Sequence, residues 1–218
     1  MKLLDSLTDK CEILLYTKKF NHSAINNYTV KNFPSDLYLL LNDDTTIIDP
    51  GWLTEMVRSI QQKDIGIVGC KLLYPDETVQ HAGVILGVGP VAGHAFRCSD
   101  KDAGVMGYRL LLKQNYSAVT GACMLIKSET YKKLNGFNEK DLPTSYNDVD
   151  LCLRAIQSGY KVLYTPVEVY HHESVSRGKE IGDLEKQYEL YMHRTWPQYI
   201  QHDPAFNPNF KRREDFSY

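Results

Sequence analysis

The sequence predicts an α/β fold in which helices flank a largely parallel β-sheet. Short apolar runs typical of buried strands recur along the chain, and segments with helical periodicity lie between them. The 218 residues, with 43% hydrophobic and 24% charged side chains, have the composition of a globular protein long enough to bury a core. No repeat, low-complexity tract or linker divides the chain, so we expect one domain over residues 1–218 that ends in a helix and tail over about residues 180–218.

The predicted elements follow one another from near the N-terminus. The run Leu37–Leu41 has no polar interruption, as expected of a strand covered on both faces of a parallel sheet. Asp49-Pro50 should start a helix, because Asp accepts a capping hydrogen bond and Pro fits the first helical position. The Gly-rich residues 72–114 predict hairpins and an active-site loop. Strands are expected at 11–16, 37–41, 65–70, 117–127 and 161–164, and helices at 21–31, after 50, and at 128–134, 147–158 and about 182–194.

The composition excludes several classes of protein. The chain has 25 Lys+Arg against 27 Asp+Glu, so it lacks the basic footprint of a general nucleic-acid binder and we expect no nucleic-acid partner. Its apolar runs are far shorter than the ~20 residues of a membrane-spanning helix. No basic-then-apolar leader opens the sequence, which predicts a cytoplasmic location. The five cysteines never form a C-x-x-C pair, so we expect buried free thiols and neither a disulfide framework nor a zinc site.

Asn42, Asp43 and Asp44 follow directly after the apolar run that ends at Leu41. Ligands of open α/β sheets bind at the carboxyl ends of strands, and oxygen-rich side chains suit a hard divalent cation that leaves positions open for a diphosphate. An Asx-rich turn that caps the next helix explains the same residues equally well.

A second acidic group, Asn147-Asp148-Val149-Asp150, opens a predicted helix. Carboxylates in a first helical turn are stabilised by the helix dipole, so capping is the simplest interpretation. Asp150 and Arg154 are four residues apart and are expected to form a surface pair of little energetic value. Asp148 is the candidate general base, because its carboxylate can lie over the end of the sheet.

Histidines form the third group of candidates. His171 and His172 lie beside Glu173 after a strand-like run, which makes one of them a candidate metal ligand, although a structural role is the more common one for a histidine. His81 and His94 lie in the Gly-rich region, where a structural or acceptor-loop role is expected.

Taken in order, these segments resemble a family 2 glycosyltransferase with the GT-A fold, of the bacterial polysaccharide or O-antigen type. The similarity covers about residues 11–217 and rests on six motifs in the expected order. They are F-N-H-S-A-I-N-N at 20–27, L-L-L-N-D-D-T at 39–45, V-T-G-A-C at 119–123, N-D-V-D-L-C-L-R at 147–154, H-H-E-S-V-S-R-G at 171–178, and D-P with N-P-N at 203–209.

The resemblance implies a role for each matched donor-side position. Asp44 would bind Mn²⁺ or Mg²⁺ on the donor diphosphate, together with His171. Asn42 replaces the first acid of the family motif and would hydrogen-bond the ribose or a metal-bound water. Asp43 lies between them and Gly121 lies in the strand beside the donor sugar, so both are expected to contact the donor.

The resemblance also assigns the acceptor side and the reaction. Asp148 would deprotonate the acceptor hydroxyl, and Asn147 stands where the family often has Glu. His172 would replace His171 if the latter were not the ligand. A single base opposite a single leaving group implies inversion, with the sugar moving from a UDP- or dTDP-sugar to a saccharide or lipid-linked acceptor. A lipid-linked acceptor would bring the protein to the inner face of the membrane.

One departure from the family concerns the N-terminus. The family usually begins with a strand of the V-S-I-I-I-P-T-Y-N type, followed by a helix and a second strand, and this sequence contains no such unit. We therefore expect weak nucleotide binding and an uncovered strand edge. Self-association, a partner chain that supplies the strands, or residues Leu3–Leu7 would cover it. A catalytically inactive remnant that serves as a binding or interaction subunit is the alternative function.

Overall fold

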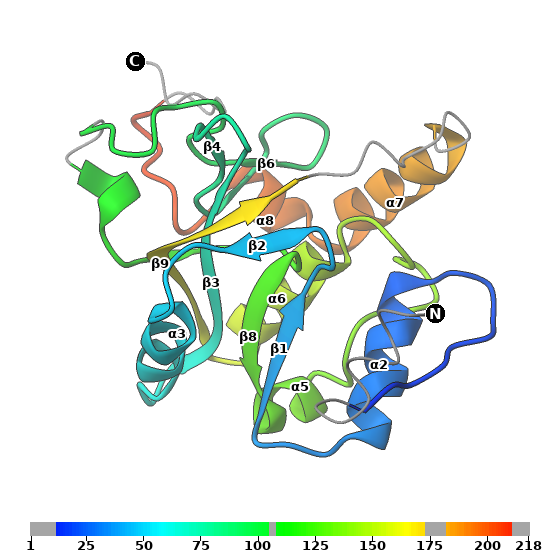
Figure 1. Ribbon diagram of the computed structural model, residues 1–218. Coiled ribbons are helices and arrows are strands. Elements are labelled where there is room, and N and C mark those ends of the chain that lie inside the picture. The colour runs from blue at the N-terminus through cyan, green and yellow to red at the C-terminus, as the bar shows by residue number, and fades with distance from the viewer. Residues whose placement is uncertain (1–11, 105–107, 173–181, 211–218) are drawn as a thin grey trace.

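The structure, a computed structural model, describes residues 12–104, 108–172 and 182–210 and confirms the α/β class (Figure 1). Its main sheet has the strand order β1-β8-β3-β9-β2, with β4 added to β3 and β7 added to β9. The strands are β1 (Leu37–Leu41), β2 (Thr45–Ile47), β3 (Ile65–Leu73), β4 (Val79–His81), β7 (Gln114–Tyr116), β8 (Cys123–Lys127) and β9 (Lys161–His171).

The sheet is mixed, so the expectation of a largely parallel sheet is wrong in this detail. β3 and β9 pair in parallel, whereas β8 runs antiparallel to both of its neighbours, β1 and β3. Because β8 lies between them, β1 and β3 point in the same direction, which β9 shares. The carboxyl ends of β1 and β9 therefore lie at the same edge of the sheet, where ligand sites of open α/β sheets form.

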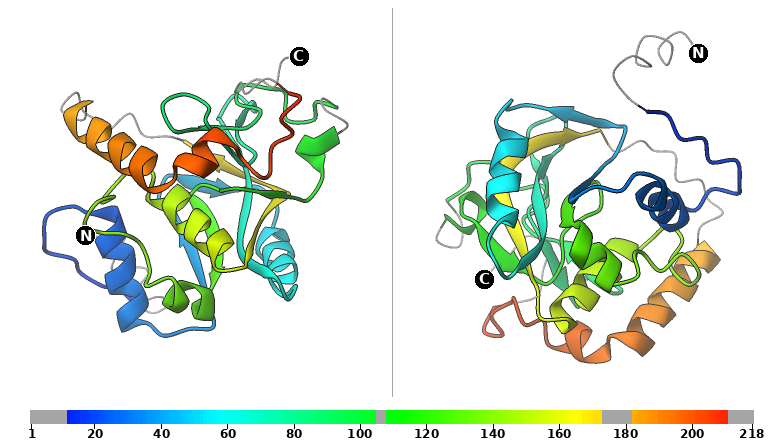
Figure 2. Two further views of the ribbon diagram at one scale, coloured as in Figure 1. Left: turned by 180° about the vertical axis from the view of Figure 1, so that it is seen from behind. Right: turned by 90° about the horizontal axis from the view of Figure 1, so that it is seen from below.

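Helices cover both faces of the sheet (Figure 2). On one face α3 (Trp52–Ile60) packs its Met56 and Ile60 against β3 and β8. On the other face α6 (Asn147–Gln157), α7 (Gly182–Thr195) and α8 (Pro197–Gln201) bury a larger cluster that includes Leu151 and Trp196. The described residues also include the α-helices α2 (His22–Asn32) and α5 (Ser128–Lys133).

The Gly-rich region forms the predicted hairpins. β5 (Val84–Leu86) pairs with β6 (Ala92–His94), and the short helix η1 (Arg109–Leu111) follows. A third apolar cluster lies under these loops and includes Phe206 of the C-terminal tail. The tail is held by Asp203, whose carboxylate accepts hydrogen bonds from the Leu86 N–H (2.8 Å) and the Ser117 hydroxyl (2.5 Å).

Four predicted strands differ from the structure. The strand expected at 65–70 continues to Leu73 as β3. Residues 12–16 form no strand, and their Leu15 side chain is 77% exposed. The strand expected at 117–127 begins only at Cys123, because the backbone of residues 117–122 bonds to other parts of the chain. β9 continues past Tyr164 to His171, and a shift in its pairing with β3 accommodates Pro166, which has no N–H to donate.

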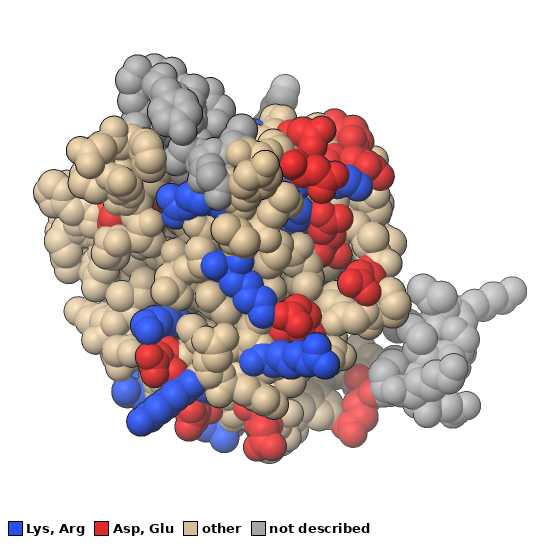
Figure 3. Space-filling view, turned by 90° about the vertical axis from the view of Figure 1, so that its left-hand side faces the viewer, with Lys and Arg blue, Asp and Glu red and all other residues tan. Residues whose placement is uncertain are grey.

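The surface charges relate to the expectation of no nucleic-acid partner, and the helices relate to the expectation of no membrane-spanning segment. Figure 3 shows one face of the molecule, on which basic and acidic side chains lie interspersed. An exposed ion pair such as Lys161–Asp64 (3.0 Å) contributes little to stability. In the described part of the chain, no helix combines the length and apolar character needed to cross a bilayer.

Candidate functional site

The turn at Asn42–Asp44 connects β1 to β2 and is held from both sides. The Asn42 N–H donates to the Ala122 carbonyl (2.9 Å), and the Asp44 carbonyl accepts from the His172 N–H (2.9 Å). The next helix, α3, begins at Trp52, and it is Asp49 that bonds the backbone before it, through Gly51 N–H (2.7 Å). The interpretation of Asn42–Asp44 as a cap of that helix is therefore wrong.

Asp44 and His171 lie side by side at the ends of neighbouring strands. His171 Nε2 is 3.0 Å from Asp44 Oδ1 and 3.3 Å from Asn42 Nδ2. The other ring nitrogen, Nδ1, is 2.6 Å from Gln80 Oε1, and the Gln80 amide donates to the His171 carbonyl (3.3 Å). Because this second bond orients the Gln80 amide, Oε1 accepts a hydrogen bond from His171 Nδ1, and Nε2 is the ring nitrogen that faces Asp44.

This arrangement fits a divalent cation that also binds a diphosphate. The carboxylate of Asp44 and the Nε2 atom of His171 are suitable metal ligands, and the buried Gln80 amide orients the imidazole, as polar groups behind metal-binding histidines commonly do. Over residues 12–104, 108–172 and 182–210, no group of three or more His, Cys, Asp or Glu side chains could hold a metal by itself. Such a cation would take its other ligands from phosphate oxygens and water, as Mg²⁺ commonly does.

The other residues predicted on the metal side lie apart from this pair. The Asp43 side chain is exposed. His172 Nε2 is 2.9 Å from the Thr46 hydroxyl, so its ring faces β2. Glu173 and the remainder of the H-H-E-S-V-S-R-G motif lie outside the described residues.

Asp148 lies in the first turn of α6, as predicted. Its Oδ2 accepts from the Gly121 N–H (2.9 Å) and its Oδ1 accepts from the Val149 N–H (2.8 Å). Asn147 is buried and supports this turn, because it donates to the Ser23 hydroxyl (2.9 Å) and accepts from the Asp148 N–H (2.8 Å). His22 packs against the same group, and burial lowers the pKa of its imidazole while the Asp148 charge opposes this shift.

Asp148 lines a cavity of about 210 Å³ beside the start of α6. Its walls come from the β5–β6 hairpin, the loop before β8, the start of α6 with the residues before it, and α7. The lining residues are Val84, Ala92, Gly93, His94, Thr120, Thr144, Ser145, Tyr146, Asn147, Asp148, Val149 and Glu185.

The loop before β8 joins the cavity to the Asp44–His171 pair. Gly121 donates to Asp148, and the next residue, Ala122, accepts from Asn42. The structure thus brings Asn42, Asp44 and His171 together. It also holds Asp148 at Gly121, the residue just before the one that bonds Asn42. A Cβ added to Gly121 would lie 3.5 Å from Asp148 Cβ, which is ordinary contact, so close approach to a ligand and not backbone strain would explain a glycine there.

Sequence reasoning missed Gln80, which orients His171, and left the role of His94 open. The contact between Gln80 and His171 spans 91 residues of chain, and no local pattern reveals it.

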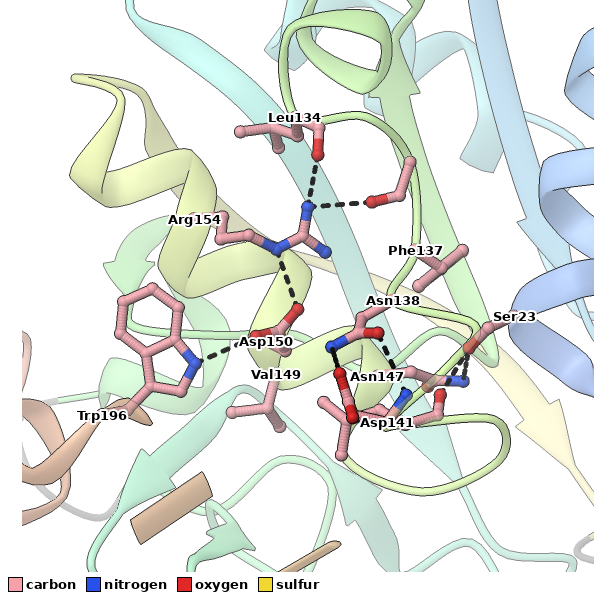
Figure 4. A network of polar contacts seen from close by, with 12 residues as sticks. Ser23, Leu134, Phe137, Asn138, Asp141, Asn147, Val149, Asp150, Arg154 and Trp196 are labelled. Atoms are coloured by element: carbon pink, nitrogen blue, oxygen red, sulfur yellow. Dashed lines mark hydrogen bonds and ion pairs between the residues drawn. The ribbon is translucent and has the colours of Figure 1, made fainter. Parts of the chain in front are cut away.

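The expected surface pair of Asp150 and Arg154 is wrong. Asp150 is 1% exposed, and it accepts from Arg154 Nε (2.8 Å) and from the Trp196 indole N–H (2.9 Å), as Figure 4 shows. Arg154 Nη1 also donates to the Leu134 (2.6 Å) and Gly136 (2.8 Å) carbonyls. The pair is therefore a buried junction between α6, the loop after α5 and the start of α8.

The mixed sheet, its flanking helices and the polar cluster at the carboxyl ends of β1 and β9 make up a GT-A fold of the glycosyltransferase class. The chain belongs to the family described as "Glycosyltransferase like family 2", whose sequence model matches residues 13–189.

Two curated relatives are much longer than this chain. The uncharacterized protein y4gI of Sinorhizobium fredii is 43% identical over 214 residues, which are 95% of this chain and 23% of that protein. The O-antigen biosynthesis protein RfbC of Myxococcus xanthus is 36% identical over 199 residues, or 90% of this chain and 16% of that protein.

Solved structures share the fold at low sequence identity. The mannosyltransferase PcManGT of Pyrobaculum calidifontis, in complex with GDP-Man and Mn²⁺, aligns with a TM-score of 0.59 at 14% identity over 94% of this chain and 51% of that one. GalNAc-T7 with UDP, GalNAc and Mn²⁺ aligns with a TM-score of 0.64 at 10% identity over 94% and 49% of the two chains.

Proposed function

We propose that this chain transfers a hexose from a nucleoside-diphosphate sugar to a hydroxyl of a saccharide or lipid-linked acceptor, in the assembly of a bacterial polysaccharide. The observation that carries the proposal is the two-residue connection Gly121-Ala122, which hydrogen-bonds Asp148 on one side and Asn42 on the other. A candidate base and a candidate cation site therefore lie next to each other, as transfer from a diphosphate to an alcohol requires.

On the donor side, Asp44 and His171 would hold Mn²⁺ or Mg²⁺. When bound, the ion neutralises charge that develops on the departing diphosphate. Gln80 keeps His171 Nε2 directed at the site, and Asn42 adds an amide that can orient a phosphate-bound water or the ribose. Asp43 and Gly121 complete the donor side, with Asp43 free to reach a nucleotide from the exposed turn.

On the acceptor side, Asp148 would accept the proton of the attacking hydroxyl. The bond between the acceptor oxygen and the anomeric carbon forms as the bond from that carbon to the diphosphate breaks, and the hydroxyl proton moves to a carboxylate oxygen of Asp148. The two backbone N–H groups that bond this carboxylate fix its position against the cavity. One base opposite one leaving group gives inversion.

The comparisons support a nucleotide-sugar donor and a saccharide acceptor. The two structural neighbours are complexes with GDP-Man or UDP and with Mn²⁺, and RfbC is described as an O-antigen biosynthesis protein. We propose UDP- or dTDP-sugars as donors, and a lipid-linked acceptor would place the chain at the inner face of the membrane.

Incubation with radiolabelled UDP-, dTDP- and GDP-sugars and Mn²⁺ tests the proposal. We expect one donor to be consumed, and we expect chelation by EDTA or the Asp44→Ala substitution to stop its consumption. Asp36→Ala, which removes an exposed carboxylate just before the other end of β1, serves as the matched control. If no donor is consumed, or if consumption is indifferent to EDTA and to Asp44→Ala, the proposal fails and the non-catalytic binding subunit becomes the better explanation.

A further inference from the structure

The motif at residues 20–27 has no part in the proposed reaction, and it lies at the start of α2, against the segment that precedes α6. Asn21 Nδ2 donates to the Glu139 carbonyl (2.9 Å). Asn27 Nδ2 donates to the Phe137 carbonyl (2.9 Å), and Asn27 Oδ1 accepts from the Phe137 N–H (2.9 Å). These partners are 110 to 118 residues apart in the chain, so α2 holds this segment from outside.

Ser23, in the first turn of α2, bonds the chain on both sides of the start of α6. Ser23 is fully buried, and its hydroxyl donates to the Leu142 carbonyl (2.6 Å). The same oxygen accepts from Asn147 Nδ2 (2.9 Å), and Figure 4 shows the two side chains together. The Ser23 N–H donates to the Pro143 carbonyl (3.1 Å). One buried residue therefore connects the incoming segment to the first residue of α6.

Tyr146, which lies between these bonded residues, has a backbone conformation that requires such support. It stands at the N-cap position of α6 with φ +57° and ψ +5°, a left-handed conformation that is rare for an aromatic residue. Among the described residues, its side chain makes no capping hydrogen bond. Strain of this kind persists only where the surrounding structure holds it, and the bonds of Ser23 on either side of Tyr146 do so.

The direction of each bond fixes the Asn147 amide. The single hydroxyl proton of Ser23 is donated to Leu142, so the Ser23 oxygen receives the Asn147 amide N–H. Asn147 Nδ2 also lies 3.2 Å from His22 Nδ1, so the amide nitrogen points toward α2. The amide oxygen is thereby turned to the Asp148 N–H, from which it accepts at 2.8 Å. Ser23 is connected in this way to the residue whose carboxylate lines the cavity.

We propose that Ser23 is a positioning residue for Asp148, which it holds through the Asn147 amide. The Asp148 N–H lies in the first turn of α6, where the helix offers it no acceptor, so the Asn147 oxygen is the partner that fixes it. A displacement of about 1 Å at a reacting group can lower a rate by about 100-fold, so a base must be held firmly. The role of Asp148 as base rests on the proposed function, whereas the chain of hydrogen bonds from Ser23 to Asp148 does not.

A double-mutant cycle tests the proposal in the full chain, with the nucleotide sugar that the donor assay identifies. Ser23→Ala should lower kcat about tenfold, as for the loss of one hydrogen bond, and leave the KM of the donor unchanged, because its hydrogen bonds lead to Asp148. In the Asp148→Asn background the same substitution should not lower kcat further, because Ser23 acts through that carboxylate. An equal fall in both backgrounds, or full kcat in Ser23→Ala, overturns the proposal.

Two further variants keep this test decisive. Ser59→Ala is the matched control and should keep full kcat, since Ser59 is also buried and its hydroxyl has no hydrogen-bond partner among the described residues. If Ser23→Ala does not fold, Ser23→Cys takes its place, because a thiol is close in size and weakens both side-chain hydrogen bonds. The same two outcomes then decide.

Amide hydrogen exchange tests the positioning without turnover. In ¹⁵N-labelled protein, we expect the Asp148 N–H to exchange about tenfold faster in Ser23→Ala than in wild type, because the Asn147 oxygen is less firmly held. The N–H of Val68, buried in β3, should exchange at the same rate in both proteins. Equal exchange of the Asp148 N–H overturns the proposal even if a nucleotide sugar is consumed. Faster exchange in a chain that consumes no donor supports the positioning of Asp148 and rejects the transferase.

Discussion

Asp148 and Asp150 are two residues apart in the first turn of α6, yet they belong to different regions of the molecule. Asp148 lines the cavity and is held by two backbone N–H groups. Asp150 lies on the inner side of the helix, where it bonds the Arg154 guanidinium and the Trp196 indole. The same residue type in the same turn therefore has two roles, and the groups that surround each carboxylate determine which.

The largest expected effect comes from removing the negative charge on the cavity side. Asp148→Asn should lower kcat for transfer by about 10²–10⁴-fold, the usual contribution of a general base. Its free energy of unfolding should fall by only about 1 kcal/mol, because the amide oxygen can still accept from one of the two backbone N–H groups that the carboxylate bonds. Steady-state kinetics and urea unfolding measure the two quantities, and retention of full kcat would remove the distinction between the two carboxylates.

The complementary substitution removes the carboxylate on the inner side. Asp150→Ala should lower the free energy of unfolding by about 3 kcal/mol, because it leaves a largely buried guanidinium without its charge partner and the Trp196 N–H without an acceptor. The activity of the molecules that remain folded should be unchanged. Asp183→Ala, at an exposed acid in the first turn of α7, is the control and should have little effect. Equal stability of the two variants would show that the buried junction is not important.

A smaller effect is expected on the donor side. Gln80→Leu should weaken Mn²⁺ binding by about 10–100-fold, the usual range for loss of a group that orients a metal-binding histidine. Isothermal titration with Mn²⁺ measures it, with Gln62→Leu as an exposed control. Unchanged affinity in Gln80→Leu would mean that the orientation of His171 does not depend on Gln80.

The last prediction concerns pH and two largely buried histidines. The folded-state pKa values of His22 and His81 are lowered by burial, so below about pH 6.5 the unfolded chain binds protons that the folded chain does not. The free energy of unfolding should therefore fall as the pH drops below that value, by about 1.4 kcal/mol per pH unit for each histidine, and the slope should end below the folded-state pKa. Urea unfolding between pH 7 and pH 5 measures the slope. His81→Phe should reduce it and Asp183→Ala should not, so an unchanged slope in His81→Phe would contradict the prediction.

Local signals in the sequence predicted most of the elements. Asn21 caps α2 as an Asx residue does, accepting from the Ala24 N–H at 2.8 Å. Gly159 follows α6 with φ +89°, a conformation that glycine adopts at low cost. The apolar run Leu37–Leu41 is β1 without adjustment at either end. Caps, turns and unbroken apolar runs depend on neighbours within a few residues, which is why the sequence shows them.

The sequence also named most residues of the candidate site, because Asn42, Asp44, Asp148 and His171 stand directly after a predicted strand or at the start of a predicted helix. It did not predict that residues 117–122 would leave the sheet. Their backbone N–H and C=O groups bond Asp148, His81 and Asn42, which lie in α6, in β4 and in the turn after β1, so the local β propensity of this segment was overridden.

What the sequence alone determined is thus the order of the elements, the acids and histidines available for chemistry, and the family. The tertiary structure alone decided their surroundings: that Asp150 is buried, that Gln80 bonds His171, and that His81 meets His94. Each of these depends on hydrogen bonds between residues brought together from separate strands and helices. A side chain's charge state, tautomer and exposure are properties of such contacts, and residue type and spacing do not specify them.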